Sequence, residues 1–289
     1  MRYDGHTRTC GLIGNPVEHT LSPLIQNHLA ESTGNNMVYV PFHVEEGRLR
    51  DAVEGAFALN LLGCNVTVPY KSDVIPFLSD IDPLAERIGA VNTLVRTEAG
   101  FKGYNTDMPG LYRAMQRDGV ELAGRVCVIL GAGGAARAVA VMLLEKQAEK
   151  VYILNRTYEK AAAVAEEVNA LAGTRFAEAM ALENYGKLPE GQKFLVIQAT
   201  NVGMYPRVED VVLEDKVFYQ KVEAGYDLIF NPGDTRFMQL VRENGGRAYN
   251  GARMLLYQGI IAYELWNQTS VSEETAEKIY KLMTEALGI

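Results

Sequence analysis

The chain has 289 residues, of which 48% are hydrophobic and 22% are charged, and this composition excludes an intrinsically disordered protein. Its formal net charge of −8 argues against general binding to nucleic-acid phosphates. The length is sufficient for two domains, each with its own core.

The first hundred residues alternate between strand-like and helix-like patterns. In chain order we expect strand 9–14, helix 22–31, strand 38–44, helix 47–59 and strand 61–68. Pro41 predicts a sheet edge or a bulge for the second strand, because proline cannot donate to a ladder. Ser22 and Pro23 offer an N-cap and a first-turn proline for the first helix. This alternation predicts a parallel or mixed sheet covered by helices.

The alternation restarts after residues 104–109, which we interpret as a loop and hinge. The later elements are expected to be helix 110–117, strand 125–131, helix 135–147, strand 151–155, helix 157–172, strands 195–198 and 226–230, helix 235–244, strand 247–249, and helices 251–266 and 272–287. The sequence therefore predicts two α/β domains with a break near residue 108.

The cysteines indicate a reducing compartment. Cys10, Cys64 and Cys127 are far apart and form no CxxC pair, so we expect neither a disulfide framework nor a zinc site. The polar segment 1–9 lacks an apolar signal core, and no apolar run approaches the ~20 residues of a membrane helix. The four histidines are scattered. We expect a soluble, cytoplasmic protein without a metal site, membrane partner or nucleic-acid partner.

The run 131–137 (GAGGAAR) follows an apolar strand and opens an alanine-rich helix. In a dinucleotide-binding βαβ unit, the first glycine of such a run makes a tight turn. The second lets the backbone approach the pyrophosphate, which the helix N-terminus then binds. The expected phosphate-binding residues are Gly131, Ala132, Gly133, Gly134 and Ala135.

The end of the next strand distinguishes NADP from NAD. An NAD site usually has an acidic residue there for the ribose 2′-hydroxyl, whereas this chain has Asn155, Arg156 and Thr157, followed by Lys160. Arg156 can face a 2′-phosphate, Thr157 can donate a hydroxyl and Lys160 adds charge. The alternative is a plain helix start, with Thr157 as N-cap and two solvated basic residues. Together with the glycine run, the pattern favours NADP.

Three polar segments of the first half are expected where strands end: 65–71, 89–93 and 105–107. They could converge at the carboxyl ends of the strands, where ligands bind in an open α/β sheet. Lys71 and Asp107 make a plausible acid/base pair for hydride transfer at an alcohol carbon, where a group must take or give the hydroxyl proton. Desolvation lowers the pKa of a lysine in general, whereas a neighbouring carboxylate raises it. The alternative is a structural salt bridge at a domain junction.

The segment 19–23 (HTLSP) can be interpreted in two ways. Thr20 and Ser22 could bind a substrate carboxylate, or Ser22 could cap a helix, which is the commoner use of serine before proline. His19 has no partner at metal-ligand spacing.

In combination, these residues resemble the shikimate dehydrogenase family, including its quinate/shikimate dehydrogenase branch. The matching segments extend over nearly the whole chain: 14–16 (GNP), 19–23 (HTLSP), 65–71 (NVTVPYK), 89–93 (GAVNT), 105–107 (NTD), 131–137 (GAGGAAR), 155–157 (NRT), 199–204 (ATNVGM), 226–228 (YDL) and 251–258 (GARMLLYQ).

The resemblance implies reversible, NADPH-dependent reduction of 3-dehydroshikimate to shikimate, a step of aromatic amino-acid biosynthesis. It implies a substrate domain over 1–108, completed by C-terminal helices 253–289, and a Rossmann NADP domain over 109–252. Closure of the two domains would exclude water before the transfer. An enzyme of broader specificity that accepts quinate, with NAD as a possible coenzyme, is the alternative. A homodimer is left open.

The resemblance also implies roles for individual residues. Lys71 looks like the catalytic lysine and Asp107 like its partner. The residues that match substrate contacts are Thr20 and Ser22 for the carboxylate, and Thr67, Asn92 and Gln258 for the hydroxyls. The further cofactor contacts are Thr200, Leu228, Gly251 and Met254, the last of them beside the nicotinamide.

Several positions depart from the family pattern. Thr20 stands where serine is usual, Phe230 where many members have a substrate-facing tyrosine, Tyr104 where aspartate is frequent, and Arg253 where glycine is frequent. Met108-Pro109 replaces a more flexible stretch. These departures affect the expected substrate more than the chemistry. A binding module without catalysis is a second class of hypothesis, but such a module should have lost Lys71 or Asp107.

Overall fold

The computed structural model describes residues 3–289, so Met1 and Arg2 of the polar N-terminal segment lie outside the described residues. The chain divides into two compact units. Unit 1 contains Met1–Leu111 and Leu255–Ala286, and unit 2 contains Tyr112–Met254 and Leu287–Ile289. We expected the breaks at 108 and 253. The last three residues join unit 2, where Ile289 lies against Gly233.

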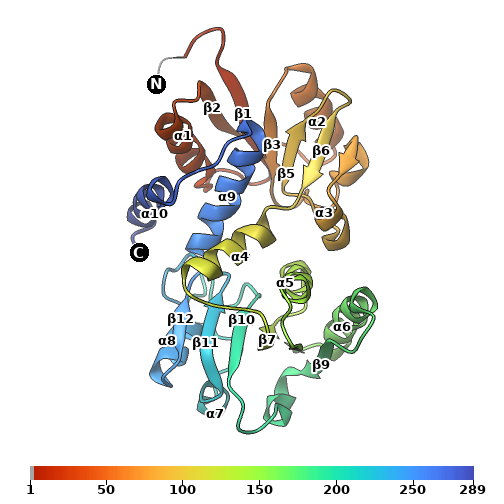
Figure 1. Cartoon of the computed structure of the whole chain (residues 1–289), viewed down its shortest axis with the longest axis vertical. Coiled ribbons are helices and arrows are strands. Elements are labelled where there is room, and N and C mark those ends of the chain that lie inside the picture. Colours follow the sequence, from red (N-terminus) through yellow and green to blue (C-terminus); the bar gives the residue numbers. More distant parts are fainter. Residues whose placement is uncertain (1–2) are drawn as a thin grey trace. The chain divides into compact units, whose positions relative to one another are not determined.

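Within the described residues, unit 1 has a six-stranded mixed sheet with the order β2-β1-β3-β5-β6-β4 (Figure 1). Its strands are β1 (Arg8–Gly14), β2 (Met37–His43), β3 (Gly63–Val66), β4 (Asp80–Ile81), β5 (Thr93–Arg96) and β6 (Phe101–Tyr104). Its helices are α1 (Ser22–Thr33), α2 (Leu49–Ala58), the 3₁₀ turn η1 (Ile75–Phe77), α3 (Pro83–Ile88) and α10 (Glu273–Leu287), with parts of α4 (Asp107–Arg117) and α9 (Ala252–Asn267). The edge position predicted for the strand of Pro41 is confirmed.

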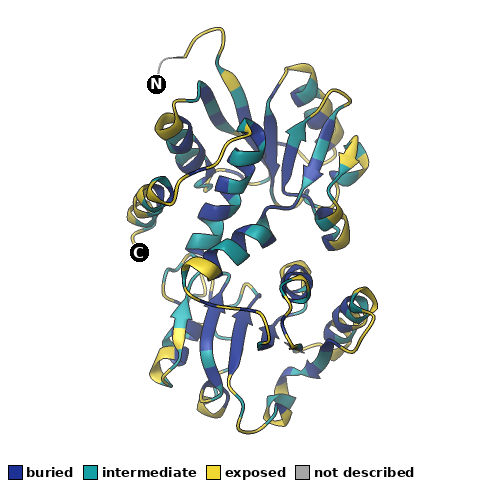
Figure 2. Ribbon diagram, in the orientation of Figure 1, coloured by how far each residue is buried: buried dark blue, intermediate teal, exposed yellow. Residues whose placement is uncertain are grey.

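The sheet of unit 1 buries both faces (Figure 2). On one face Ile13, Val66 and Leu94 join a cluster with side chains of α2 and α3. On the other, α1 and α9 are joined by a hydrogen bond from Gln26 Nε2 to the Gly259 carbonyl, at 2.8 Å. Trp266 of α9 donates from Nε1 to the Leu94 carbonyl, also at 2.8 Å. The C-terminal helix α9 is therefore part of the core of unit 1.

Strand direction in unit 1 corrects one sequence expectation. We expected segment 89–93 to follow a strand, but it precedes β5. Because β5 runs antiparallel to β3, with Thr93 opposite Asn65, its beginning lies beside the end of β3. Strand β6 is antiparallel to β5, with Tyr104 opposite Thr93, so its end reaches the same edge. The three polar segments therefore meet because β5 is antiparallel to both β3 and β6, which the pattern of apolar residues did not predict.

The expected loop at 104–109 is also corrected, because α4 begins at Asp107. Asn105 Oδ1 accepts hydrogen bonds from the backbone N–H groups of Asp107 (3.1 Å) and Met108 (3.3 Å). These are N–H groups that a helix start leaves without an intrahelical partner. Pro109 fits the first turn because its missing N–H costs no helical bond there.

Within the described residues, unit 2 contains a six-stranded parallel sheet with the order β12-β11-β10-β7-β8-β9. Its strands are β7 (Val126–Leu130), β8 (Lys150–Asn155), β9 (Ala177–Ala181), β10 (Phe194–Gln198), β11 (Val222–Asp227) and β12 (Arg247–Tyr249). Its helices are α5 (Gly134–Glu145), α6 (Tyr158–Ala172), the 3₁₀ segment η2 (Leu182–Lys187), α7 (Lys216–Tyr219) and α8 (Arg236–Glu243). This is the strand order of the Rossmann fold, whose ligand crevice lies beside the first strand, here β7.

The strands of unit 2 are apolar on both faces, as expected for a parallel sheet covered by helices. Val126, Val128 and Leu130 join a core with side chains of α7 and α8. Cys127 and Ile129, which alternate with these residues along β7 and so point to the opposite face, are also fully buried. Sequence patterning missed β9 and α7, which have only five and four residues.

A buried carboxylate ends β11 earlier than we expected. The apolar run 226–230 predicted a strand, but β11 stops at Asp227, which is fully buried. Asp227 Oδ1 accepts from the Ile229 N–H at 3.0 Å, and Oδ2 accepts from Thr235 Oγ1 at 2.6 Å. Burial raises the pKa of Asp227 to about 7, although these two hydrogen bonds oppose the shift.

We predict that Gly110→Ala destabilises the protein. A Cβ at residue 110 of α4 would meet the backbone nitrogen of Gln258 in α9 at 2.6 Å, and that backbone cannot move without shifting the helix. Overpacking costs ~1–3 kcal/mol, more than the ~1 kcal/mol that alanine gains over glycine in a helix. Gly55→Ala in α2 is the matched control, because nothing lies within 4 Å of its Cβ position. Urea unfolding should show a loss for the first variant and a gain for the second; equal gains would contradict the close helix contact.

A second prediction concerns pH. Because the pKa of Asp227 is raised on folding, the folded state binds its proton more tightly than the unfolded state. Its contribution to stability is therefore complete below the unfolded pKa, near 3.8, and is lost as the pH rises through about 7. Asp227→Asn cannot ionise. The unfolding free energy of the wild type minus that of this variant should fall by up to about 4 kcal/mol between acid and mildly alkaline pH. A difference that is constant with pH would refute the shift.

Candidate functional site

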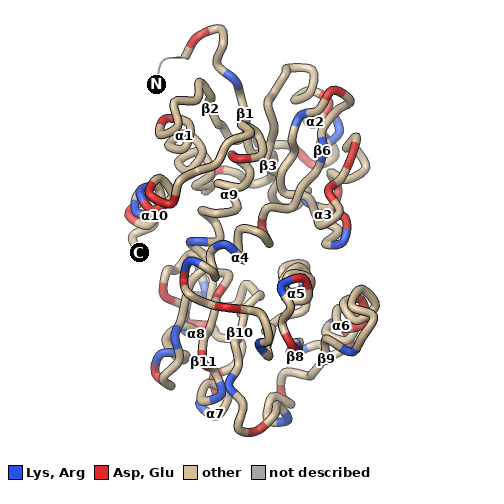
Figure 3. Tube along the Cα trace, in the orientation of Figure 1, with Lys and Arg blue, Asp and Glu red and all other residues tan. Residues whose placement is uncertain are grey.

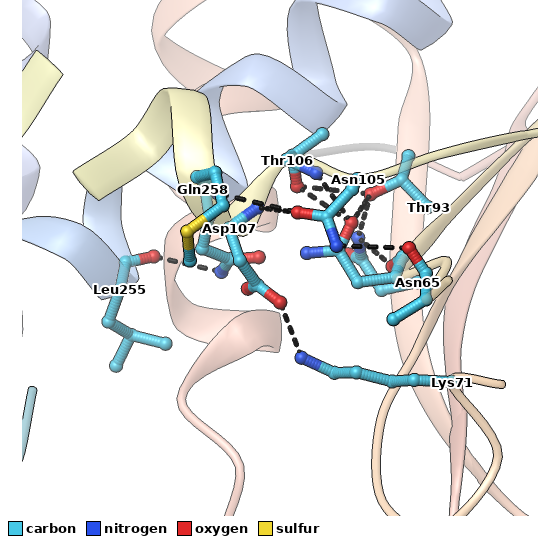
Figure 4. Close-up of polar contacts among 11 residues, drawn as sticks. Asn65, Lys71, Thr93, Asn105, Thr106, Asp107, Leu255 and Gln258 are labelled. Carbon is cyan, nitrogen blue, oxygen red and sulfur yellow. Dashed lines mark hydrogen bonds and ion pairs between the residues drawn. The ribbon is translucent and has the colours of Figure 1, made fainter. Parts of the chain in front are cut away.

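A lysine and an aspartate meet beyond the end of β3 in the sheet of unit 1 (Figure 4). Lys71 follows β3, and Asp107 is the first residue of α4. Lys71 Nζ donates a hydrogen bond to Asp107 Oδ2 at 2.5 Å, and the two side chains are 33% and 19% exposed. The pair is therefore partly shielded but open to a ligand. Such a pair can hold a proton and deliver it to an oxygen atom.

A buried polar network supports the start of α4 (Figure 4). Asn92 Oδ1 accepts from the Thr106 N–H (2.8 Å), from Thr106 Oγ1 (3.1 Å) and from Thr93 Oγ1 (3.0 Å). Asn65 Nδ2 donates to Thr93 Oγ1 at 3.0 Å. The backbone of Lys71 is tied to the same place, because its carbonyl accepts from the Val91 N–H at 2.7 Å. These bonds fix Thr106, the residue before Asp107, and the backbone of Lys71.

Thr20 and Ser22 lie together, but Ser22 is not the helix cap that one interpretation assigned to it. Ser22 is the first residue of α1, the N-cap position is Leu21, and no side chain caps the helix. Instead Thr20 Oγ1 donates to Ser22 Oγ at 3.1 Å and accepts from the Ser22 N–H at 3.2 Å. The two adjacent hydroxyls suit a carboxylate, which could accept from both.

Thr67 and Gln258 lie on two further segments of unit 1. Thr67 follows β3, and its methyl group packs so closely on Gly14 that a Cβ there would lie 2.3 Å away. Gln258 in α9 is half-buried, and its Nε2 donates to the carbonyl of Leu255 in the preceding turn, at 2.9 Å (Figure 4). Gly110, one turn after Asp107, allows the close approach of α9 at this residue.

Unit 2 has a cavity of about 840 Å³ at the carboxyl ends of β7, β8 and β10. Its lining includes the predicted cofactor contacts Gly131, Ala132, Gly133, Gly134, Ala135, Asn155, Arg156, Thr157, Lys160 and Thr200. This volume is typical of a site for a large organic ligand. The glycine-rich run and the basic segment after β8, which are separate in sequence, therefore border one space.

The glycine run has the geometry that a phosphate site needs. Gly131 has a φ of +115°, in the region that favours glycine, and a Cβ there would lie 2.8 Å from the Thr200 methyl carbon. Nothing lies within 4 Å of the Cβ positions of Gly133 and Gly134, so a phosphate can approach the backbone at the start of α5. Arg137 does not face such a ligand alone, because it is paired with Glu167 of α6.

The basic segment after β8 presents free side chains to this cavity. Thr157 occupies the N-cap position of α6 but makes no side-chain cap hydrogen bond. Arg156, Thr157 and Lys160 are all exposed and line the cavity. Thr157 therefore holds the N-cap position without a side-chain capping bond, and the exposure of Arg156 and Lys160 agrees with both interpretations of this segment. Figure 3 shows Lys and Arg spread over several elements of unit 2.

The structure does not place every predicted cofactor contact in this cavity. Leu228, Gly251 and Met254 are not among its lining residues. Leu228 and Gly251 do contact each other, since a Cβ at Gly251 would meet the Leu228 carbonyl oxygen at 2.2 Å. The loop after β10 adds lining residues that the sequence reasoning missed: Arg207, Glu209, Asp210 and Glu214. No spacing signal marks them, because they lie on an irregular loop.

Two of the residues that depart from the family pattern, Arg253 and Tyr104, have structural partners. Arg253 forms an ion pair with Asp118 at 3.1 Å, and Tyr226 donates to the other oxygen of Asp118 at 3.2 Å. Tyr104 ends β6, and the ammonium of Lys102 lies 5.7 Å from the centre of its ring. Phe230 is half-buried. Nothing here explains why phenylalanine stands at this position.

Residues 3–289, the range that the structure describes, contain neither a metal-binding cluster nor a membrane-spanning helix. No group of three or more His, Cys, Asp or Glu side chains in this range is arranged to hold a metal ion. None of the helices in this range combines the length and apolar character needed to cross a membrane.

Comparisons with known proteins identify the family. Residues 12–94 match the shikimate dehydrogenase substrate-binding domain, and residues 113–188 match the shikimate/quinate 5-dehydrogenase family. The shikimate dehydrogenase (NADP(+)) of Desulforamulus reducens is 41% identical over 270 residues, which cover 92% of this chain and 91% of that protein.

Solved structures agree along the whole chain. Shikimate 5-dehydrogenase from Listeria monocytogenes, in complex with shikimate and NAD, has a TM-score of 0.90 at 31% identity and covers 98% of both chains. The Thermus thermophilus enzyme, in complex with NADP(H) and shikimate, has a TM-score of 0.82 at 32% identity, covering 96% of this chain and 99% of that one. The chain belongs to the shikimate dehydrogenase family.

Proposed function

We propose that the chain catalyses the reversible NADP-dependent reduction of 3-dehydroshikimate to shikimate, with Lys71 and Asp107 as its catalytic pair. The observation that carries the proposal is the 2.5 Å hydrogen bond between these two side chains, at a sheet edge bordered by hydroxyl and amide groups. Curated relatives named shikimate dehydrogenase (NADP(+)) support the reaction. They favour shikimate over the broader quinate/shikimate alternative.

The substrate carries a carboxylate and hydroxyl groups, and unit 1 offers a partner for each. Thr20 and Ser22 exchange their mutual hydrogen bond for bonds to the carboxylate. Asn92 offers its amide nitrogen to a hydroxyl, because its oxygen already accepts three hydrogen bonds. Thr67 and Gln258 bind the remaining hydroxyls. These contacts hold the reacting carbon in one orientation, which is a large part of catalysis.

The proton is handled by the catalytic pair. Reduction of a carbonyl adds a hydride to carbon and a proton to oxygen, and bound NADPH supplies the hydride. Lys71 Nζ gives its proton to the carbonyl oxygen as that oxygen becomes the hydroxyl of shikimate. In the oxidative direction the same nitrogen takes the proton back. Asp107 Oδ2 holds the amine in place throughout by accepting its hydrogen bond.

The cavity of unit 2 fits NADP. The amides at the start of α5 bind the diphosphate, and the open space over Gly133 and Gly134 leaves room for it. Arg156 and Lys160 bind the 2′-phosphate, supported by their exposure and the absence of an acidic residue at 155–157. Charge-assisted hydrogen bonds of this kind are about twice as strong as neutral ones. Leu228, Gly251 and Met254 remain proposed contacts on the nicotinamide side.

We place the reaction in the cytoplasm, because Cys10, Cys64 and Cys127 are free buried thiols. The catalytic pair and the cofactor cavity both come from one chain. A homodimer would carry one catalytic pair and one cofactor cavity in each copy.

A substrate and cofactor matrix tests this proposal. Wild type, Arg156→Ala and Arg175→Ala are assayed with shikimate or quinate, each with NADP or NAD. Arg175 is an exposed arginine outside the cavity lining and is the matched control. We expect the highest kcat/KM of the wild type with shikimate and NADP. Arg156→Ala should raise the KM for NADP about 10- to 100-fold, since losing a charged contact costs ~1.5–3 kcal/mol, and should change the KM for NAD much less.

Two outcomes would overturn parts of the proposal. Faster turnover with NAD than with NADP in the wild type would refute the assignment of Arg156. Faster turnover of quinate than of shikimate would refute the substrate assignment.

A further inference from the structure

Gln198, the last residue of β10, makes an unusual number of contacts for one side chain. It is 1% exposed. Its Oε1 accepts from the Thr200 N–H at 2.6 Å and from Thr200 Oγ1 at 2.7 Å. Its Nε2 lies within hydrogen-bond distance of the Thr200 carbonyl (3.3 Å) and the Val202 carbonyl (3.2 Å). The side-chain amide of Gln198 therefore supplies hydrogen bonds to backbone groups of Thr200 and Val202, which lie beyond the end of β10 and lack strand partners for these groups.

The residues that Gln198 binds border the cofactor cavity. Thr200 and Val202 both line it, whereas Gln198 does not. The methyl group of Thr200 packs on Gly131, so closely that a Cβ there would lie 2.8 Å from it. The position of Thr200 thus also limits the position of the tight turn that begins the glycine run.

The same amide reaches the next strand. Gln198 Nε2 lies 3.4 Å from Asp227 Oδ1, the oxygen that accepts the Ile229 N–H. The Gln198 carbonyl accepts from the Leu228 N–H at 3.1 Å. Leu228 in turn contacts Gly251. Gln198 is therefore bonded to the segment that follows β10, which contains Thr200, and to the segment that follows β11, which contains Leu228. Both Thr200 and Leu228 are proposed cofactor contacts.

We infer that Gln198 is a positioning residue for the cofactor, acting through Thr200 and Val202 and, with Asp227, through Leu228. The inference rests on the proposed NADP site and deepens it. Gln198 itself is not among the residues that line the cavity, so it would act through the lining residues to which it is bonded.

The chemistry of the side chain explains why an amide is needed. The segment 199–202 presents one N–H and two carbonyl groups to the interior, and a primary amide can both donate and accept. A carboxylate can only accept, and an apolar side chain can do neither. Replacing the amide would leave buried backbone groups without partners, and the loop would have to move toward water to satisfy them.

The test compares Gln198→Met, which keeps the length of the side chain and removes its polar groups, with a matched control. Asn169→Leu removes an amide that bonds the backbone of Ala177 at 2.9 and 2.7 Å, in the same unit but outside the cavity lining. NADPH binding is measured without substrate by fluorescence or calorimetry. We expect at least a tenfold rise in Kd for Gln198→Met and less than a twofold change for Asn169→Leu. The KM for shikimate at saturating cofactor should stay within twofold in both.

The opposite results overturn the inference. If Gln198→Met binds NADPH within twofold of the wild type, or if Asn169→Leu weakens binding equally, the role of Gln198 is only structural. Direct binding also separates this inference from the proposed function. A wild type that binds NADPH but does not oxidise shikimate contradicts the function alone.

A second pair of variants keeps the inference testable if Gln198→Met does not fold. Gln198→Glu retains both acceptor bonds to Thr200 but, at a pH above about 7, where Asp227 is ionised, it places a second carboxylate against Asp227, so NADPH binding should weaken there. The double variant Gln198→Glu/Asp227→Asn removes that repulsion. Its Kd for NADPH should be at least threefold lower than that of Gln198→Glu. Unchanged binding in the single variant, or no recovery in the double variant, would refute the pairing of Gln198 with Asp227.

Discussion

The 2.5 Å hydrogen bond between Lys71 and Asp107 depends on the strand order and strand directions of unit 1. Lys71 must leave β3 at the edge where α4 begins, and this requires β5 to run against β3 and β6 to return beside it. Asn105 and Asn92 then satisfy the backbone and side-chain groups at the start of α4. Because buried polar groups without partners are costly, this network leaves Asp107 a single arrangement.

Unit 2 solves a different problem, since it must hold a charged ligand over the ends of apolar strands. In the proposed NADP site, Gly131, Gly133 and Gly134 leave room for the phosphates, and Arg156 and Lys160 would supply the positive charge. The buried residues Gln198 and Asp227 stand at the ends of the two adjacent strands, where chain segments would otherwise lack partners. In the proposed site, the glycines and basic residues would contact the ligand, and the buried residues Gln198 and Asp227 would hold the neighbouring chain segments in place.

Much of the fold follows from sequence patterns, because long apolar strands and helices have clear periods. The βαβ unit and its glycine run are examples, and Asn155-Arg156-Thr157 indicated the coenzyme. The short strands β4 and β5 were missed, as two to four residues cannot show a period. The start of α4 and the end of β11 depend on side-chain bonds from Asn105 and Asp227, which no local pattern encodes. Gln198 was missed for the same reason.

The most direct test of the account is a double-variant cycle on Lys71→Met and Asp107→Asn, measured as kcat for shikimate at saturating NADP. If the two residues act as one unit, each single variant should lose about 10²–10⁴-fold in kcat. The double variant should be no slower than the worse single variant, since effects of residues acting together are not additive. NADPH binding should stay close to that of the wild type in all three. Turnover like that of the wild type in Lys71→Met would contradict the account.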